Sequence, residues 1–238
     1  MSGEQFSTYG GPDGPMDTSP RPFGEIPGLW LKVTQMTEEF FAQEAPRASG
    51  SNVLISVVIL AVASAILSAL SSAITSLIGG GTQMAFLPPE YRDIAAAGMG
   101  GGVMTALCTG LIGTVIGFYL GNGLVYLGAR IFGGSGDFGT QTYLQSLVVV
   151  PIGIVSGVAG LVPCLGALAA LALAIYGIVL WVRVIKVVHN LTTGKAVAAI
   201  FVPGLVLGLI AVCLVIVPLA LLGPQIGEIF EDIVNNLQ

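Results

Sequence analysis

Five long apolar stretches constrain this chain more than any other feature of its sequence. A helix needs about 20 mostly apolar residues to cross the hydrocarbon core of a bilayer, and each stretch meets that length. The middles of these stretches contain no charged residue. The sequence therefore predicts an all-α polytopic membrane protein, built around a bundle of five transmembrane helices. The predicted spans are residues 53–78, 103–127, 143–162, 167–188 and 197–222.

The overall composition excludes most other classes of protein. Charged residues make up 9% of the 238 residues, against about a quarter in a typical soluble domain. Only eight residues are Lys or Arg, so no basic stripe exists to bind nucleic acid. The cysteines, Cys108, Cys164 and Cys213, are odd in number and widely spaced, which fits neither a disulfide framework nor a zinc site. We therefore predict no metal and no cofactor.

The regions that flank the spans have their own patterns. Residues 1–26 are rich in Gly, Pro, Ser and Asp, a composition typical of a disordered tail. Residues 27–50 are predicted to form an amphipathic segment at the membrane surface, with Trp30, Phe40 and Phe41 as interfacial aromatics and Thr37 as a helix cap. The predicted transmembrane domain covers residues 51–224. Residues 225–238 are predicted to form an amphipathic C-terminal helix.

The positions of Lys and Arg predict the orientation in the membrane. With five crossings, seven of these residues fall on the side of the N-terminus, and only Arg92 falls on the other side. Positive charge accumulates in cytoplasmic loops, so we expect a cytoplasmic N-terminus and an external C-terminus. In a prokaryote the membrane would be the plasma or inner membrane. Tyr126, Tyr143, Tyr176, Trp181 and Phe201 also lie toward the cytoplasmic ends of their spans.

Residues able to carry chemistry are scarce. An ionisable group inside the hydrocarbon usually marks a proton relay or a substrate site, and the middles of the spans hold none. No acid and base pair is therefore available, and we do not expect an enzyme. His189 lies near Arg183 and Lys186 at a membrane edge, together with Trp181. These four residues are expected to contact headgroups or the interface, and we do not expect His189 to act as a catalytic base.

Small residues recur every four positions within the spans. Helices in lipid associate where such residues let their backbones approach closely, so these rows are candidate helix contacts. They can serve packing inside the five-helix bundle, or one row can bind a partner protein or a second copy. The rows contain Ser64, Ser68 and Ser72; Gly113, Gly117 and Gly121; Gly153 and Gly157; and Gly204 and Gly208.

The stretch from residue 130 to residue 201 carries a family resemblance. The turn Gly133-Gly134-Ser135-Gly136-Asp137-Phe138 precedes the third predicted span. A Pro-interrupted hairpin follows, with Tyr176 in its second helix, and then His189-Asn190-Leu191-Thr192 with Lys195-Ala196. This order resembles the Yip1 family, in particular its prokaryotic branch, and the similarity extends from residues 30–41 to the fifth span.

The resemblance implies five spans and a cytoplasmic N-terminus. In eukaryotic members it also implies association with small GTPases and with one another in vesicle trafficking. The acidic Tyr-Gly-Pro signature of those members has no clear counterpart in this chain, so small-GTPase binding is not carried over as an expectation.

Three hypotheses for function follow. The leading one is a non-enzymatic scaffold or membrane-organising factor of the Yip1 type, whose partners are membrane lipids and other membrane proteins or a second copy. The second is a small-solute or lipid transporter, in which prolines 151, 203 and 218 kink helices beside a neutral pathway. The third is an accessory subunit of a larger membrane complex.

Overall fold

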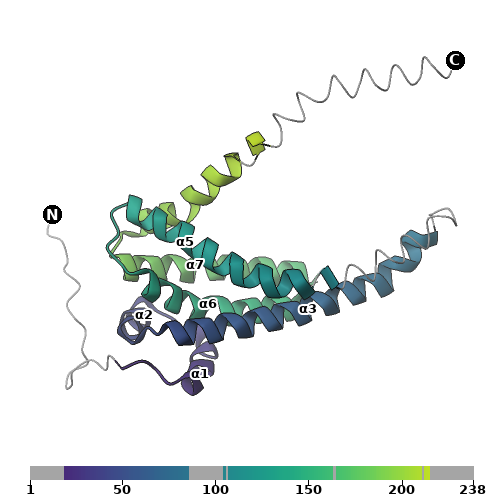
Figure 1. Ribbon diagram of the computed structural model, residues 1–238, viewed down its shortest axis with the longest axis horizontal. Coiled ribbons are helices and arrows are strands. Elements are labelled where there is room, and N and C mark those ends of the chain that lie inside the picture. The colour runs from purple at the N-terminus through teal and green to yellow at the C-terminus, as the bar shows by residue number, and fades with distance from the viewer. Residues whose placement is uncertain (1–18, 86–103, 106, 163–164, 211, 215–238) are drawn as a thin grey trace, which may run out of the picture.

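The computed structural model describes residues 19–85, 104–105, 107–162, 165–210 and 212–214, and these residues form helices and connecting turns without a strand (Figure 1). Most of the predicted disordered tail, residues 1–18, lies outside the described residues. The predicted C-terminal helix, residues 225–238, lies outside them as well.

Five helices are long and apolar enough to cross a membrane, which confirms the predicted all-α polytopic fold. The candidate spans within them are Gly50–Ile74, Gly110–Ile131, Phe138–Ala159, Gly166–His189 and Thr193–Leu214. The helices themselves are α3 (Gly50–Ala85), a π-helical turn η4 (Thr109–Gly113) that continues into α5 (Thr114–Ile131), α6 (Phe138–Ala159) and α7 (Leu165–His189). The helix over Thr193–Leu214, unlabelled in Figure 1, is called the last helix below.

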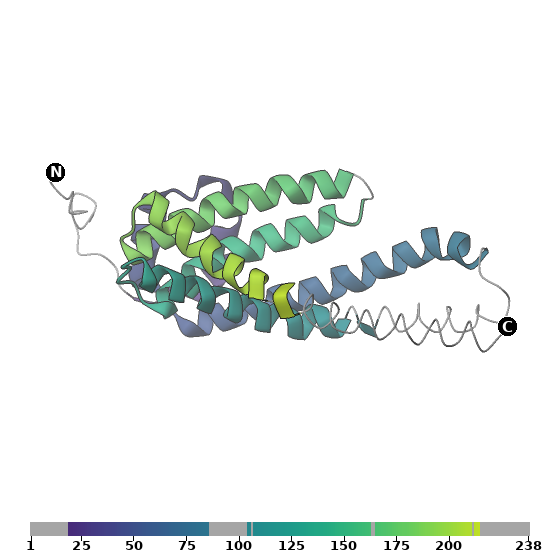
Figure 2. The ribbon, with the colours of Figure 1, turned by 90° about the horizontal axis from the view of Figure 1, so that it is seen from above.

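Short helices precede α3 and pack against one end of the bundle. They are η1 (Phe23–Glu25), α1 (Ile26–Trp30), η2 (Val33–Gln35), α2 (Glu38–Glu44) and η3 (Ala45–Arg47). Residues 19–48 are called the N-terminal segment below. The turns after α5 and α7 lie at the same end of the molecule, which we call the polar end (Figures 1 and 2).

Helix α2 begins where the sequence predicts a cap. The Thr37 side chain accepts a hydrogen bond from the backbone N–H of Phe40 at 3.3 Å, with Glu38 and Glu39 in the first turn. Negative charge in the first turn suits the positive end of the helix dipole. Hydrogen bonding to Thr37 lowers the pKa of Glu39, so its charged form is favoured.

Helix α6 begins five residues before the predicted span, at Phe138 instead of Tyr143. The Asp137 carboxylate caps it by accepting a hydrogen bond from the Thr140 backbone N–H at 2.9 Å. Every residue from Gln141 to Val148 is buried, polar and apolar alike. This stretch covers about two helical turns. Its polar residues are buried in the protein, and a search for apolar runs does not include them because they are polar.

Replacing Asp137 by alanine is expected to lower the free energy of unfolding by about 1 kcal/mol, because the first turn of α6 loses its acceptor. Replacing it by asparagine should leave stability nearly unchanged, since Asn caps helices as well as Asp does. Thermal unfolding in detergent measures both variants. Equal losses in the two variants would show that the carboxylate charge matters instead of the cap.

The larger hydrophobic core lies beside the turns after α5 and α7, at the end of the molecule named the polar end. It includes side chains of the N-terminal segment. Ile26, Met36 and Phe41 are almost fully buried and pack with Val57 of α3 and Leu180 of α7. A smaller cluster joins the ends of α5 and α7 to the last helix, with Val125, Ile185 and Ala199 as members. The helices are buried to different degrees, since half of the α6 span is buried but only 12% of the last helix.

The described part of the N-terminal region packs on the bundle. Residues 19–26, placed in a disordered tail by composition, end in Ile26, which has no exposed surface. Within residues 27–50, Phe41 is fully buried within the protein and Leu31 is 87% exposed, and a position of this segment at the membrane surface stays a prediction. An apolar side chain suits a protein core as well as it suits lipid, so the sequence pattern alone does not separate the two.

Candidate functional site

The two sequence motifs that carry the family resemblance meet at the polar end. The Ser135 backbone N–H donates to the His189 carbonyl oxygen at 3.3 Å, and Gly134 N–H donates to the Ala129 carbonyl at 2.8 Å. A Cβ on Gly136 would lie 2.3 Å from the Val188 carbonyl oxygen, and one on Gly134 would lie 2.8 Å from the His189 Cβ. The glycines therefore let the turn after α5 lie directly on the end of α7.

A chain of buried side chains joins three helices beside this turn. His189 Nε2 lies 2.8 Å from Gln141 Oε1, and Gln141 Nε2 donates to the Asn122 carbonyl oxygen at 2.9 Å. Asn122 Nδ2 in turn donates to the Phe118 carbonyl at 2.9 Å. With the Gln141 amide nitrogen used as a donor to Asn122, its oxygen faces His189, so Nε2 of the imidazole is the donor.

This arrangement assigns a structural role to His189. The residue is 1% exposed, and its second nitrogen, Nδ1, is buried without a hydrogen-bond partner in the described part of the chain. A general base needs a nitrogen within reach of a substrate proton, and neither nitrogen is accessible here. The imidazole, expected at a headgroup or the interface, instead ties α7 to α6 inside the protein.

A partly buried ion pair joins two ends of the N-terminal segment, and both of its residues also bind helices of the bundle. Arg21 binds Glu44 through two hydrogen bonds, one of them Nε to Oε2 at 3.0 Å, and binds Glu25 at 2.7 Å. The Tyr143 hydroxyl of α6 donates to the same Glu44 carboxylate at 3.4 Å. Hydrogen bonding to Glu44 raises the pKa of Arg21 above its ordinary value. Asn52 of α3 completes the cluster by donating to the Arg21 carbonyl at 2.7 Å.

Helix α7 contributes a second set of attachments to the N-terminal segment. Its Tyr176 hydroxyl donates to the Val33 carbonyl at 2.9 Å, and Arg183 Nη1 donates to the Met36 carbonyl at 2.9 Å. Lys186 Nζ forms an ion pair with Glu38 at 2.9 Å. Arg183 and Lys186, predicted as interfacial residues, therefore bind protein groups at the polar end.

One family of known proteins matches most of the chain, including most of the residues that make these contacts. The Yip1 domain matches residues 36–215. The chain belongs to the Yip1 family. No curated protein and no solved structure gives a significant match. Arg21 precedes the matched region, so the ion pair with Glu44 attaches residues outside the Yip1 domain to residues inside it.

The predicted interfacial aromatics of this Yip1-family protein have different environments. Phe41 is fully buried, whereas Trp30, Phe40 and Trp181 are half-buried. The indole N–H groups of Trp30 and Trp181 are buried without a hydrogen-bond partner among the described residues. Trp30 and Phe40 pack on the larger core cluster, and Trp181 packs on the smaller one.

The candidate helix-contact residues fall into two groups. Ser64, Ser68 and Ser72 are half-buried along α3, and Cβ atoms on Gly153 and Gly157 would lie within 2.8 Å of Leu60 and Leu67. The other group is open: Gly113 is exposed, and Cβ atoms on four glycines would meet nothing within 4 Å, namely Gly117, Gly121, Gly204 and Gly208. A helix-contact role for this second group stays a prediction.

Two close helix crossings in the Yip1 domain use glycines that the sequence analysis did not select. A Cβ on Gly110 would lie 2.4 Å from the Ala65 Cα, where η4 crosses α3. A Cβ on Gly128 would lie 2.4 Å from the Ala199 carbonyl oxygen, where α5 crosses the last helix. Gly128 follows Gly121 by seven residues, two helical turns, and this spacing was the available signal.

The described part of the chain contains no group of three or more His, Cys, Asp or Glu side chains that could hold a metal ion. The polar groups that do converge, at His189 and at Glu44, are occupied by hydrogen bonds between helices. These hydrogen bonds hold the helices of the polar end in a fixed arrangement.

Proposed function

We propose that this membrane protein of the Yip1 family acts as a non-enzymatic scaffold, through contacts between transmembrane helices and through its N-terminal region. The observation that carries the proposal is the open face of α5. A Cβ on Gly117 or Gly121 would meet no described residue within 4 Å, and Ile116 and Leu120 beside them are 52% and 63% exposed. Small residues flanked by large aliphatic ones form a face on which a second helix can pack.

The helix contacts of four other glycines support this proposal. Gly110, Gly128, Gly153 and Gly157 each lie against another helix of the same chain. The face with Gly117 and Gly121 is composed in the same way, but no other helix among the described residues packs on it. A partner protein or a second copy is therefore its proposed occupant. Membership of a generally non-enzymatic family also supports a role without catalysis.

Charge distribution supports a cytoplasmic position for the polar end. The described cations lie in the N-terminal segment, at the ends of α5 and α7, and at the start of the last helix. Positive residues favour the cytoplasmic side of a membrane, which places the N-terminal segment there in our proposal. The cations are Arg21, Lys32, Arg47, Arg130, Arg183, Lys186 and Lys195.

The test replaces Gly117 and Gly121 together by valine, which adds side chains to the open face. We expect the variant to fold as the wild type does, because the new side chains displace no described residue. We also expect it to lose most of its association, because the valines keep a partner helix away from this face. Chemical crosslinking in membranes, followed by purification in mild detergent, measures recovered partners and second copies. The matched control is Gly123→Val on the same helix, which also meets nothing within 4 Å.

A wild-type protein recovered only as a monomer without partners would overturn the proposal. Equal association of the double variant and the wild type would reject this face as the contact. Flux measurements in liposomes separate the scaffold from the transporter hypothesis, since a scaffold leaves permeability unchanged.

A further inference from the structure

Helix α7 binds the N-terminal segment at three levels along its length, through Tyr176, Arg183 and Lys186. The Tyr176 contact lies farthest from the polar end, and there the hydroxyl donates to the Val33 carbonyl oxygen at 2.9 Å. Tyr176 precedes His189, the last residue of α7, by thirteen positions. At about 1.5 Å of rise per residue, the Tyr176 backbone lies roughly 20 Å from the end of the helix. The N-terminal segment therefore extends along the side of the bundle, as the position of α1 in Figure 1 also shows.

The exposed aliphatic surface of α7 includes the level of Tyr176. The exposed large aliphatic side chains of this helix are those of Leu168, Leu171, Ile175 and Val179. Closer to the polar end, α7 has no exposed large hydrophobic residue among those described, and Arg183 and Lys186 follow instead. Tyr176 lies between Ile175 and Val179. The N-terminal segment thus reaches the depth at which this spanning helix exposes aliphatic side chains.

The packing of α6 between α7 and α3 relates this level to α3. A Cβ on Gly177, next to Tyr176, would lie 3.4 Å from Ile152 of α6. On the following residue of α6, Gly153, a Cβ would lie 2.8 Å from Leu60 of α3. The level of Tyr176 on α7 therefore corresponds to the level of Leu60 on α3.

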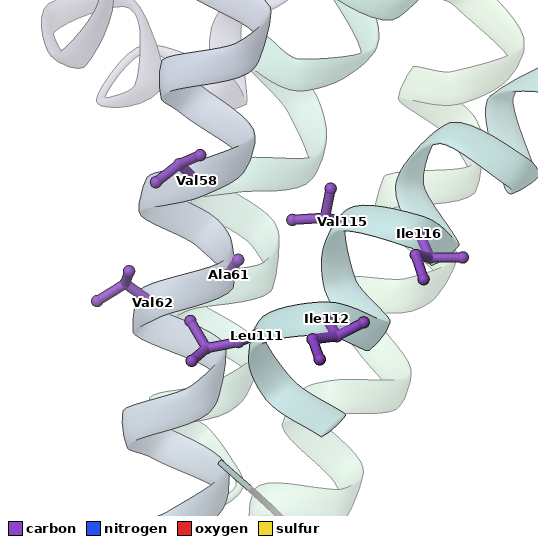
Figure 3. Close-up of a pocket in the computed structure, with 7 residues that line it drawn as sticks. All are labelled: Val58, Ala61, Val62, Leu111, Ile112, Val115 and Ile116. Atoms are coloured by element: carbon purple, nitrogen blue, oxygen red, sulfur yellow. The ribbon is translucent and has the colours of Figure 1, made fainter. Parts of the chain in front are cut away.

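Helix α3 is also apolar on its exposed side at this level. Val58 and Val62, on either side of Leu60, are 46% and 45% exposed. Figure 3 shows Val62 pointing away from η4 and α5. Exposed aliphatic side chains on two spanning helices at one level are expected where hydrocarbon surrounds the protein. The Val33 contact therefore lies below the membrane surface.

Leu31 lies close to this contact and points away from the protein. It is 87% exposed, more than any other large hydrophobic residue of the described chain. Its Cα lies at most about 7 Å from that of Val33, since one residue spans no more than about 3.6 Å. The backbone N–H groups of Leu31 and Lys32 donate to Pro27 and Leu29 at 3.3 and 2.9 Å. Backbone donors in lipid need such internal acceptors, so the turn is suited to an apolar environment.

The neighbours of Leu31 show how the turn is oriented. Ile26 and Leu29 of α1 are buried in the core, so Leu31 is directed away from the side chains that fix this segment to the bundle. Lys32 is exposed, and a lysine can lay its aliphatic stem along apolar groups while its ammonium reaches the headgroups. We propose that the turn at Leu31 and Lys32 is a membrane-binding site. Leu31 inserts among the acyl chains of the phospholipid leaflet at the polar end, and Lys32 extends to the headgroups.

The test measures the depth of residue 31 in a bilayer. Leu31→Cys is made in the full chain with its three native cysteines replaced by alanine, labelled with a nitroxide and reconstituted in phosphatidylcholine vesicles. Oxygen concentrates in hydrocarbon and a water-soluble nickel complex stays outside it, so electron paramagnetic resonance with both reagents reports depth. We expect oxygen to relax this label more strongly than the nickel complex does. The variant should fold as the wild type does, because Leu31 is mostly exposed, and gel filtration verifies this.

Two matched labels calibrate the measurement. Val179→Cys on α7, at a residue that is 43% exposed, should respond as the Leu31 label does. Lys195→Cys, at an exposed residue near the start of the last helix, should respond more strongly to the nickel complex. A Leu31 label that behaves like the Lys195 label would place the turn in water and overturn the proposal. A label shielded from both reagents would show that protein covers the turn, and would overturn it as well. Neither result bears on the Gly117 and Gly121 face, which crosslinking tests separately.

Discussion

Gly128→Leu is expected to separate the last helix from α5 and to lower the free energy of unfolding by about 1–3 kcal/mol, the usual cost of overpacking. A Cβ at this position would lie 2.4 Å from the Ala199 carbonyl oxygen and 2.8 Å from Pro203 Cγ. The first of these atoms is backbone, so the two helices must move apart. The last helix has few other contacts that could compensate, since only 12% of its span is buried.

The matched control for this prediction is Gly123→Leu on the same helix, because a Cβ there meets nothing within 4 Å. It has the same gain in helix propensity and in volume. Thermal unfolding in detergent measures stability, and spin labels on α5 and the last helix measure their separation. Equal stability of the two variants, with an unchanged separation, would contradict the crossing at Gly128.

Arg21→Met is expected to lower the free energy of unfolding by about 3 kcal/mol, because it leaves a buried carboxylate without its cation. Glu44 is only 5% exposed, and its remaining described side-chain partner is the Tyr143 hydroxyl at 3.4 Å. The residues around Arg21 should then separate from Glu44, while the contacts of α7 still hold the rest of the N-terminal segment. Limited proteolysis of residues 19–48 and thermal unfolding together measure this change.

The double variant Arg21→Met with Glu44→Leu should recover most of the lost stability, since no unpaired charge stays buried. Lys32→Met is the matched control, because it removes an exposed cation from the same N-terminal segment. If the single Arg21 variant were as stable as the Lys32 control, the ion pair would contribute little to the stability of the protein.

The spans were predictable because hydropathy is a local property of the sequence. The fourth predicted span, residues 167–188, differs by one residue at each end from the Gly166–His189 span of the structure. The start of α6 was less predictable. Gln141 and Thr142 are polar and buried, and only their partners in the folded protein explain why they belong to a spanning helix.

The contacts between distant residues were not predictable from spacing. Arg21 and Glu44 are separated by 23 positions, and His189 and Gln141 by 48. Four-residue spacing identified Gly153 and Gly157, which do lie against α3, and also Gly117 and Gly121, where a Cβ would meet no described residue within 4 Å. Spacing places glycines on one face of a helix, but the fold decides which face another helix covers.

The unequal burial along the bundle has a mechanical consequence. The buried residues of α6 lie between Gln141 and Pro151, on the side of the polar end, and the second half of the helix is more exposed. The described helices are therefore more deeply buried at the polar end than at the other end. When a bilayer becomes thicker or thinner, helices adapt mainly by changing tilt. When bilayer thickness changes, we therefore expect the helix ends opposite the polar end to change their spacing more than the polar end does.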